Sequence, residues 1–589
     1  MRNLIIAGAV VAVGAAGYMV SQQGDDGGPD QEPKTAAVKS SVLDYIPADT
    51  VFFSGQLEPF PLKGYLQNTT FAQTAVPEEL IYELEHERDP QKLFFSSLIQ
   101  TYFQAATSAA SFQKTFGLPD KLEGAVYAVG LLPVVRYKSS DSQAIWSLFD
   151  KAEQDSGYKH ELRTLKGLQY RVYPLTPQGG DDQKGPEKLE LLVAEQDSWV
   201  TITLNSHLNT EQDLEVAFAL KKPASSLQNT GVVQAIQKKH NYLPHSIAYF
   251  DHKALVTAFT TENGNSLATM ITKAIQQGND KQALAEVRNP DCQAEMGEIV
   301  ASWPRTVMGM REMDISEQRS YMKASMIVES SNSSVMKALA SIQGFIPSYL
   351  KEKQIFGYGI GIDANKLNPA LSSIWSAVLE PTYKCAPLQE MQQSMQQSNP
   401  AALAMFTGMV QGVKGVGMAV QDFSVNLNGP QPQVDSIQGL ISLSADNPEV
   451  LFNMAKNFAP PLAGIELPTD GTPVDLSTVM PAPPEVNIKP MLALKGKHLV
   501  IYSGEKGEQQ ANSLAQEQPV SNGLMNLSLD YKEMLSPIIP VLETNAADPE
   551  VTKQLQILKD MDMHVTMDID LSADGIEISS VADMKAPAN

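Results

Sequence analysis

The chain has 589 residues, which is enough for two to four domains, each with its own hydrophobic core. Apolar residues make up 43% of it and charged residues 19%, the proportions of a folded globular protein. The formal net charge of -23 argues against a nucleic-acid partner, because phosphate binding needs a basic face. It also argues against docking on anionic lipid headgroups.

Residues 4–20 form an uncharged apolar run, LIIAGAVVAVGAAGYMV, with Arg2 before it and an acidic, Gly-rich stretch after it. A helix of this length rises about 25 Å, slightly less than the roughly 30 Å hydrocarbon core of a bilayer. Positive charge before the run and acid after it favour a cytoplasmic N-terminus. The sequence therefore predicts a transmembrane anchor at residues 1–20, with a single pass through a bacterial inner membrane and the C-terminal bulk in the periplasm.

A cleaved signal peptide is the alternative interpretation of residues 1–20. The small residues Gly14, Ala15 and Ala16 follow an apolar stretch, as signal peptidase requires. Cleavage near Ala16 would leave a soluble periplasmic protein, so both interpretations export the chain. Residues 21–41 contain almost nothing that could be buried, which predicts a flexible tether.

Cys292 and Cys385 are the only cysteines in the chain. They lack the CxxC spacing and the neighbouring histidines of a metal site. In an exported chain an even number of cysteines predicts a disulfide between them. Closing a loop of 93 residues would stabilise the fold by about 4.5 kcal/mol through the lost entropy of the unfolded chain.

Four strand patterns end at a carboxylate and are followed by apolar residues four and eight positions later, which is helical spacing. The four acids are Glu58, Asp251, Asp363 and Asp530. A carboxylate at the start of a helix accepts hydrogen bonds from free N–H groups and meets the positive end of the helix dipole. We interpret the four positions as strand-corner-helix units of a duplicated module, and not as a set of functional acids.

Other segments show the two-residue period of half-buried strands. These are Gly124–Tyr137, Leu168–Leu175, a hairpin from Lys188 to Leu204, and the terminal strand Met561–Leu571, in which Met, Val, Ile and Leu alternate with Asp, His and Thr. One apolar and one polar face are typical of antiparallel sheets.

The sequence therefore predicts an α+β fold. After the N-terminal membrane helix we expect two lobes of mainly antiparallel sheet with packed helices, built from repeated strand-corner-helix units. The N-terminal lobe covers residues 42–285 and the C-terminal lobe residues 286–589. The second lobe holds 21 of the 24 methionines. Methionine fills cores adaptably and also lines apolar grooves of broad specificity.

Several short motifs resemble an uncharacterised family of exported bacterial proteins with a domain of unknown function. They are the opening Ile46-Pro47-Ala48-Asp49-Thr50, the strand Gly130-Leu-Leu-Pro-Val-Val-Arg136, Gly167-Leu-Gln-Tyr-Arg171 and Tyr383-Lys384-Cys385. Members of the family begin with a Pro-Ala-Asp-Thr-like strand. The resemblance implies export and an α+β fold, and it implies no activity or site residue.

Two common hydrolase signatures are missing. The chain contains neither the G-x-S-x-G elbow nor the H-E-x-x-H motif of hydrolases. His240, His245 and His252 form the densest histidine group, but in extended chain they are too far apart to converge on one metal ion. The G-x-G-x-G run at Gly357 lies within a strand pattern, so it indicates close packing instead of a phosphate loop. No catalytic, cofactor-binding or metal-binding residue is predicted.

The leading functional hypothesis is a non-enzymatic envelope protein. It would be tethered to the inner membrane through residues 4–20 and would bind or scaffold an envelope protein or a lipid. The alternative is a periplasmic carrier or chaperone that holds an apolar ligand in the C-terminal lobe, in a cavity lined by Met405, Met409, Met418 or Met454. A hydrolase with an unrecognised site, with His245 or His252 in it, is the second alternative.

Overall fold

The structure is a computed structural model. It describes residues 42–68, 87–175, 189–278, 284–397, 408, 410–426, 433–477, 479, 488–544, 555, 559 and 562–585. By its internal contacts the described chain forms two compact units, with the division between Ala324 and Ser325. The boundary predicted at residues 285 and 286 falls in unit 1, between two of its helices.

The strands of unit 1 form an antiparallel sheet. They are β1 (Phe52–Gly55), β2 (Gly124–Val129), β3 (Leu132–Lys138), β4 (Glu161–Leu165), β5 (Leu168–Pro174), β6 (Leu189–Gln196), β7 (Trp199–Ser206), β8 (Ile247–Asp251) and β9 (Arg305–Ile315). Their order across the sheet is β4-β5-β6-β7-β3-β2-β1-β8-β9. β10 (Arg319–Glu329) pairs with β9 and carries the chain from unit 1 into unit 2.

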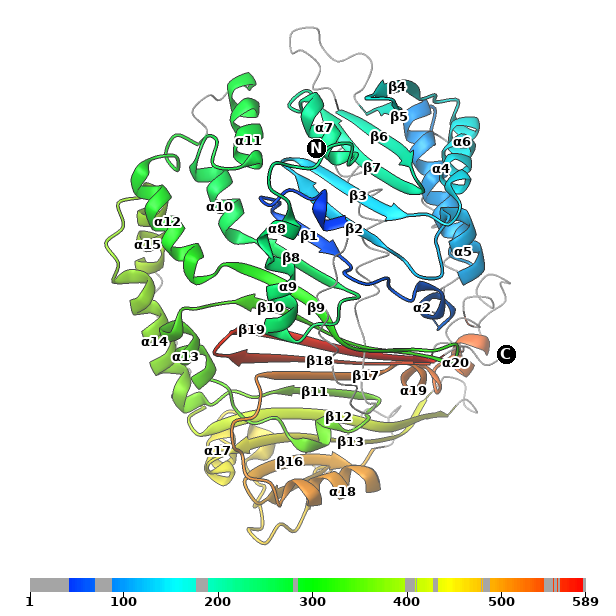
Figure 1. Ribbon diagram of the computed structural model, residues 1–589. Helices are drawn as coiled ribbons and strands as arrows, with labels where there is room; N and C mark the ends of the chain where they lie inside the picture. The colour runs from blue at the N-terminus through cyan, green and yellow to red at the C-terminus, as the bar shows by residue number, and fades with distance from the viewer. Residues whose placement is uncertain are drawn as a thin grey trace. The chain divides into compact units, whose positions relative to one another are not determined.

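The helices of unit 1 lie on both faces of its sheet. They are η2 (Val42–Asp44), α2 (Leu62–Asn68), α4 (Pro90–Ala105), α5 (Ala109–Phe116), α6 (Ser142–Ser156), α7 (Glu211–Ala217), α8 (Leu227–Thr230), α9 (Val232–His240), α10 (His252–Thr260), α11 (Ser266–Gln277) and α12 (Pro290–Ser302). α4, α5 and α6 pack against one another on one side (Figure 1). On the opposite face Phe218, which follows α7, packs on Tyr170 of β5.

The strands of unit 2 also pair in antiparallel fashion. Its strands are β11 (Phe356–Ile360), β12 (Val413–Asn426), β13 (Gln433–Ala445), β14 (Val474–Asp475), β15 (Met491–Lys495), β16 (His498–Ser503), β17 (Met525–Asp530), β18 (Asp562–Ser572) and β19 (Gly575–Lys585). Their order is β14-β15-β16-β13-β12-β11-β17-β18-β19. The helices are α13 (Ser333–Ser341), η3 (Ser348–Lys351), α14 (Ala364–Leu379), α15 (Ala386–Gln397), α17 (Pro448–Ala455), η4 (Pro460–Leu462), α18 (Gly504–Leu514), α19 (Tyr531–Leu535) and α20 (Ile539–Thr544).

The two units repeat the same topology. The order β5-β6-β7-β3-β2-β1-β8-β9 of unit 1 matches β14-β15-β16-β13-β12-β11-β17-β18 of unit 2, strand for strand in chain order. The register agrees as well, because Phe52 pairs with Phe250 in unit 1 and Phe356 pairs with Leu529 in unit 2. In both units an aspartate directly follows the second member of that pair and starts a helix. It is Asp251 after Phe250 and Asp530 after Leu529. The interpretation of the chain as a duplicated module is thereby supported.

Three of the four predicted corners are helix caps. Asp251 accepts a hydrogen bond from the N–H of Ala254, Asp363 from that of Asn365 and Asp530 from that of Glu533. The prediction for Glu58 is wrong. Phe60, between two prolines, forms a β-bridge with Leu122, which keeps the chain extended, so α2 begins only at Leu62.

The glycines of β11 allow close packing, as the sequence predicts. A Cβ atom at Gly359 would lie 2.4 Å from a methyl carbon of Leu350. At Gly361, directly after the strand, it would lie 2.3 Å from the carbonyl oxygen of Gly523. The segment Phe345–Leu350, which overlaps η3, packs into the core on this face of unit 2.

The prediction of a transmembrane helix is corrected by the structure. Within the described ranges no helix combines the length and the apolar character that a bilayer crossing requires. Residues 1–20, on which that prediction rested, and the tether predicted at residues 21–41 lie outside those ranges. The structure shows an α+β architecture of antiparallel strands with packed helices, and the single-pass inner-membrane location is not retained.

Both cysteines are disulfide-bonded in the structure. Cys292 lies in the first turn of α12 and Cys385 directly precedes α15. Each of the two is fully buried. Disulfides persist in oxidising compartments, so the bond points to such a compartment and not to a reducing one.

The cap of α10 provides a test of the corner geometry. We expect Asp251→Ala to lower the free energy of unfolding by about 1 kcal/mol, because the N–H of Ala254 loses its acceptor. Asp251→Asn should retain most of the stability, since an amide oxygen can still accept the bond. Glu58→Ala, at the corner without a cap, should change it by less than about 0.5 kcal/mol. Urea denaturation followed by circular dichroism would measure all three, and equal losses in Asp251→Ala and Glu58→Ala would contradict the assignment.

Candidate apolar binding site

One face of the unit 1 sheet forms the floor of the candidate site. Strand register places Ser54 of β1 beside Val126 of β2, Val126 beside Val135 of β3, and Val135 beside Ile202 of β7. Residues directly opposite one another on neighbouring strands point to the same side of the sheet. The floor is therefore a row of small or medium side chains across four strands.

Local sequence determines where the covering helices begin and end. Asp89 accepts from the N–H groups of Gln91 and Lys92, and Pro90 occupies the first helical position of α4. α5 ends at Gly117, which adopts the left-handed conformation with φ 61°. α6 starts after Asp141, which accepts from the N–H of Gln143. The apolar residues Phe94, Leu98 and Tyr102 of α4 recur every fourth position and so share one side of the helix.

The helices and the sheet enclose a cavity of about 240 Å³ that is partly open to solvent. Its walls come from β1, β2, β3, β7, α2, α4, α5, α6 and the segments between them. The lining residues are mostly aliphatic or aromatic: Ser54, Gln56, Phe60, Leu62, Tyr65, Leu66, Leu98, Ile99, Tyr102, Phe112, Phe116, Leu118, Leu122, Gly124, Ala125, Val126, Val135, Arg136, Tyr137, Ile145, Leu148, Phe149 and Ile202.

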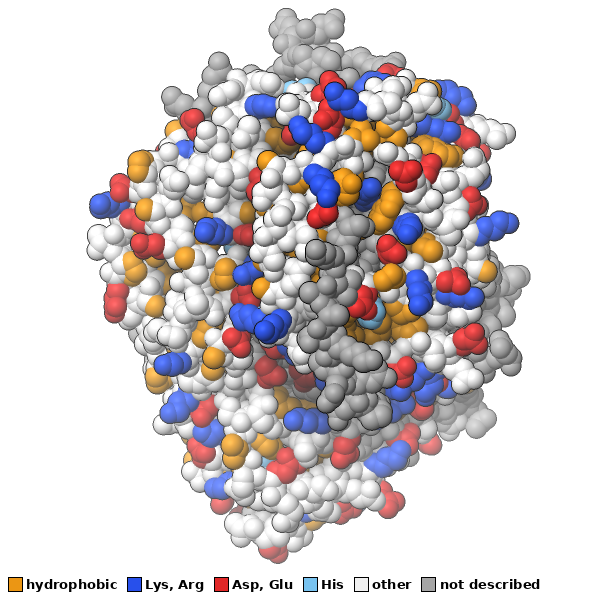
Figure 2. Space-filling view, viewed as in Figure 1, with side chains coloured by type: hydrophobic (Ala, Val, Ile, Leu, Met, Phe, Trp, Pro, Cys, Tyr) orange, Lys and Arg blue, Asp and Glu red, His pale blue; other side chains and the backbone are white. Residues whose placement is uncertain are grey.

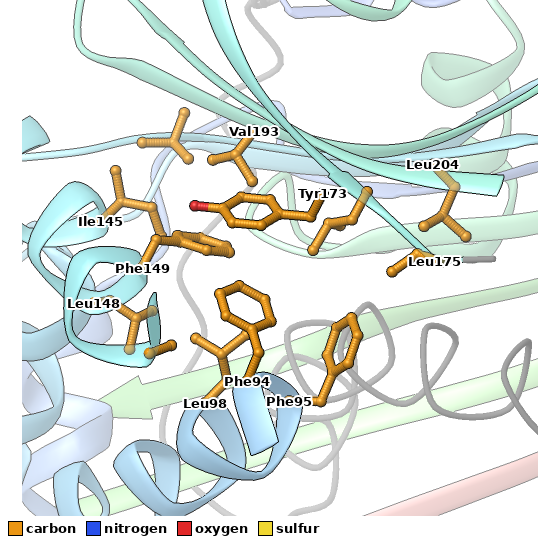
Figure 3. Close-up of a cluster of buried hydrophobic side chains, with 13 residues drawn as sticks. Phe94, Phe95, Leu98, Ile145, Leu148, Phe149, Tyr173, Leu175, Val193 and Leu204 are labelled. Carbon is orange, nitrogen blue, oxygen red and sulfur yellow. The ribbon is translucent and has the colours of Figure 1, made fainter. Parts of the chain in front are cut away.

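A dense aromatic core adjoins the cavity. Phe94 of α4 stacks on Tyr173 of β5 with 4.7 Å between ring centroids, and Phe149 of α6 stacks on the same tyrosine at 5.3 Å (Figure 3). Leu98, Ile145, Leu148 and Phe149 belong both to this core and to the cavity wall. Because the core is close-packed, it holds α4 and α6 at a fixed distance from the sheet.

A second aromatic group lines the cavity from α4 and α5. Tyr102 contacts Phe112 at 5.7 Å and Phe116 at 6.2 Å between ring centroids, and Phe112 contacts Phe116 at 4.8 Å. These rings supply large apolar surfaces of fixed shape with few rotatable bonds. They can pack against an apolar ligand.

Two polar groups of the lining are engaged within the protein. Oε1 of Gln56 accepts a hydrogen bond of 2.8 Å from the N–H of Gly124, and the hydroxyl of Tyr137 donates to the carbonyl oxygen of Phe116 at 3.2 Å. Burial raises the pKa of Tyr137 far above its ordinary value, so this hydroxyl stays protonated. Both contacts shape the wall of the cavity.

Two other hydroxyls of the lining, those of Ser54 and Tyr102, have no hydrogen-bond partner among the described residues. Ser54 is 3% exposed and Tyr102 is half-buried. Burial raises the pKa of Tyr102, which keeps its hydroxyl a neutral donor. The site therefore offers hydrogen-bonding groups without a charge.

Unit 2 shows why the cavity lies in unit 1. The residues at the places of Ser54, Val126, Val135 and Ile202 are Tyr358, Met418, Ile441 and Ile501. Three of these four are larger than their counterparts. Ile441 is 48% exposed, so the equivalent face of unit 2 is not covered at this point.

The methionines predicted to line a cavity do not lie at this one. Met418 is half-buried in β12 and Met454 of α17 is exposed, while Met405 and Met409 lie outside the described residues. None of the residues that line the cavity belongs to the Met-rich unit 2. The sequence signal that was missed is the group of six aromatic residues between Phe94 and Phe116.

The three histidines of the predicted group lie in different elements of the fold. His252 begins α10, with Nδ1 at 2.8 Å from the carbonyl oxygen of Trp303 and Nε2 at 3.0 Å from the hydroxyl of Thr306. His240 ends α9 and His245 lies in the segment before β8. In the described part of the chain no cluster of three His, Cys, Asp or Glu side chains has metal-binding geometry.

A charged cluster around Glu153 joins α6 to β5 and to His160, directly before β4. The carboxylate of Glu153 is 4% exposed and accepts from the hydroxyl of Tyr173 at 2.9 Å, while Nδ1 of His160 lies 2.5 Å from it. Nη1 of Arg171 lies 3.6 Å away. The carboxylate thus has several partners, and a buried carboxylate needs them for stability.

A buried Ser–His pair in unit 2 resembles a catalytic dyad in geometry alone. Oγ of Ser444 lies 2.8 Å from Nδ1 of His498, and Nε2 of His498 lies 3.1 Å from the carbonyl oxygen of Glu517. Because Nε2 faces an acceptor, it carries the ring proton, and Nδ1 accepts from Ser444. Both side chains are 0% exposed, so a substrate could not reach the hydroxyl.

Comparisons of the chain with protein-family models, with curated proteins and with solved structures gave no match. The resemblance to an exported bacterial family therefore stays a prediction.

The buried imidazole of His498 gives a pH-dependent prediction. Burial lowers the pKa of His498 below its ordinary 6.5, because the charged form is disfavoured inside the protein. The unfolded chain then binds more protons than the folded one. The free energy of unfolding should fall as pH drops below 6.5 and continue to fall until pH passes the folded-state pKa.

Urea denaturation between pH 7.5 and 5 would measure this effect. His498→Gln should remove that part of the pH dependence, whatever its effect on absolute stability. His207→Gln, at an exposed histidine, serves as the matched control and should keep it. An unchanged pH slope in His498→Gln would show that another group is responsible.

Proposed function

We propose that this protein binds a small apolar ligand in the unit 1 cavity and catalyses no reaction on it. The observation that carries the proposal is the cavity of about 240 Å³ with its predominantly aliphatic and aromatic walls. An apolar cavity of about 150 Å³ already accepts benzene, so the present one suits a larger body. Each Å² of apolar surface removed from water contributes about 25 cal/mol to binding.

The architecture around the cavity supports binding rather than chemistry. Its floor is a hydrogen-bonded sheet and its helices are held by caps and by the aromatic core, so the site is preformed and little entropy is lost on binding. The lining residues include no histidine, cysteine, lysine or carboxylate. Ser54 therefore has no base beside it among the lining residues.

The proposal retains the carrier hypothesis in a changed form. The ligand is apolar, but its site lies in unit 1 and not in the Met-rich C-terminal lobe. The disulfide between the chain's two cysteines supports action in an oxidising compartment.

Binding of N-phenyl-1-naphthylamine, a neutral dye whose fluorescence rises in apolar surroundings, tests the proposal. We expect saturable binding to the full chain at one site. Val135→Phe, which enlarges a floor residue, should weaken the dye's affinity at least tenfold because the phenyl group takes up ligand space.

Ile441→Phe is the matched control, since Ile441 occupies the place of Val135 in the duplicated unit and lines no part of the cavity. It should leave affinity unchanged. Thermal unfolding by circular dichroism would verify that both variants fold. Absence of saturable dye binding to the unaltered chain, or equal losses in the two variants, would overturn the proposal.

A further inference from the structure

We infer that the ligand of the unit 1 cavity is an uncharged amphiphile, a hydrocarbon body that carries a hydroxyl or carbonyl group. This inference rests on the proposed function and specifies the class of ligand. It follows from which polar groups line the cavity and from which are directed elsewhere.

Arg136 is the one residue with a charged side chain among those that line the cavity, and its guanidinium lies on the other face of the sheet. Its neighbours in β3, Val135 and Tyr137, are on the cavity side, and side chains alternate along a strand. The guanidinium stacks over the rings of Trp199 at 5.0 Å and Tyr45 at 5.4 Å. Trp199 pairs with Lys138, so it too lies on that opposite face.

An ionised headgroup in the cavity would therefore have no counter-ion among the lining residues. Taking an unpaired carboxylate or ammonium out of water costs several kcal/mol. The chain's net charge of -23 adds unfavourable long-range energy for an anion. On the face shown in Figure 2, acidic and basic side chains are interspersed, without a basic patch to offset that charge.

The hydroxyls of Ser54 and Tyr102 provide what a neutral headgroup needs. Both line the cavity and neither has a hydrogen-bond partner within the described part of the chain. Each can donate to a carbonyl or an ether oxygen, and each can accept from an alcohol. A pure hydrocarbon would leave both unpaired, which costs about 1–3 kcal/mol for each buried group. The site thus favours a ligand with one polar, neutral end.

Competition against bound N-phenyl-1-naphthylamine tests the inference with a matched set of probes at pH 8: 1-decanol, decanoate and decylammonium. We expect 1-decanol to displace the dye at a concentration at least tenfold lower than either ion. Displacement by decanoate or decylammonium at the same concentration as 1-decanol would overturn the inference, while dye binding itself would still support the proposed function. A chain that binds neither dye nor alcohol would overturn both.

Variants separate the hydroxyl contribution from simple apolar partition. The double variant Ser54→Ala, Tyr102→Phe should weaken 1-decanol binding at least fivefold more than it weakens binding of the dye. Tyr170→Phe, which removes a hydroxyl on the opposite face of the same sheet, is the control and should change neither. Unaltered alcohol affinity in a folded double variant would show that these hydroxyls do not bind the headgroup.

Discussion

The register of β1, β2, β3 and β7 is the constraint on which the binding site depends. It aligns Ser54, Val126, Val135 and Ile202 on one face. A slip of one residue in any of these strands would turn that strand's floor residues to the opposite side of the sheet. The aromatic core around Phe94, Phe149 and Tyr173 then determines how far α4 and α6 stand from that floor. The cavity is the space that remains where small floor residues meet helices held apart by large rings.

The duplication shows how a shared fold acquires a site in one copy. Both units have the same strand order and matching register, so the backbone alone does not create a cavity. The two units differ in the volume of the floor side chains and in the helices that lie over them. Ser54 has the larger Tyr358 as its counterpart. The chain between β1 and β2 carries α2, α4 and α5, whereas the chain between β11 and β12 carries α14 and α15. The binding site therefore depends on which side chains fill the module and which helices cover its sheet.

The polar clusters away from the cavity exist because buried polar side chains need hydrogen-bond or ion-pair partners. Glu153 lies among Tyr173, His160 and Arg171, and His498 lies between Ser444 and the carbonyl oxygen of Glu517. Such groups must be paired because an unpaired polar atom in the interior costs more than the pair contributes. Their geometry resembles that of catalytic residues, yet Glu153, Ser444 and His498 are inaccessible. The polar groups that a ligand in the cavity can reach include the hydroxyls of Ser54 and Tyr102.

The sequence by itself determined the features that depend on local periodicity: the α+β class, the antiparallel strands, the three aspartate caps and the repeat of strand-corner-helix units. Local rules failed at Glu58, where a long-range bridge from Phe60 to Leu122 delays the helix. Only the tertiary structure decided where the cavity lies, since its lining comes from segments between Ser54 and Ile202 that are joined by strand pairing. Composition pointed to the methionines of the second lobe, but a cavity depends on which side chains face one another across a sheet and its helices, and no local pattern carries that information.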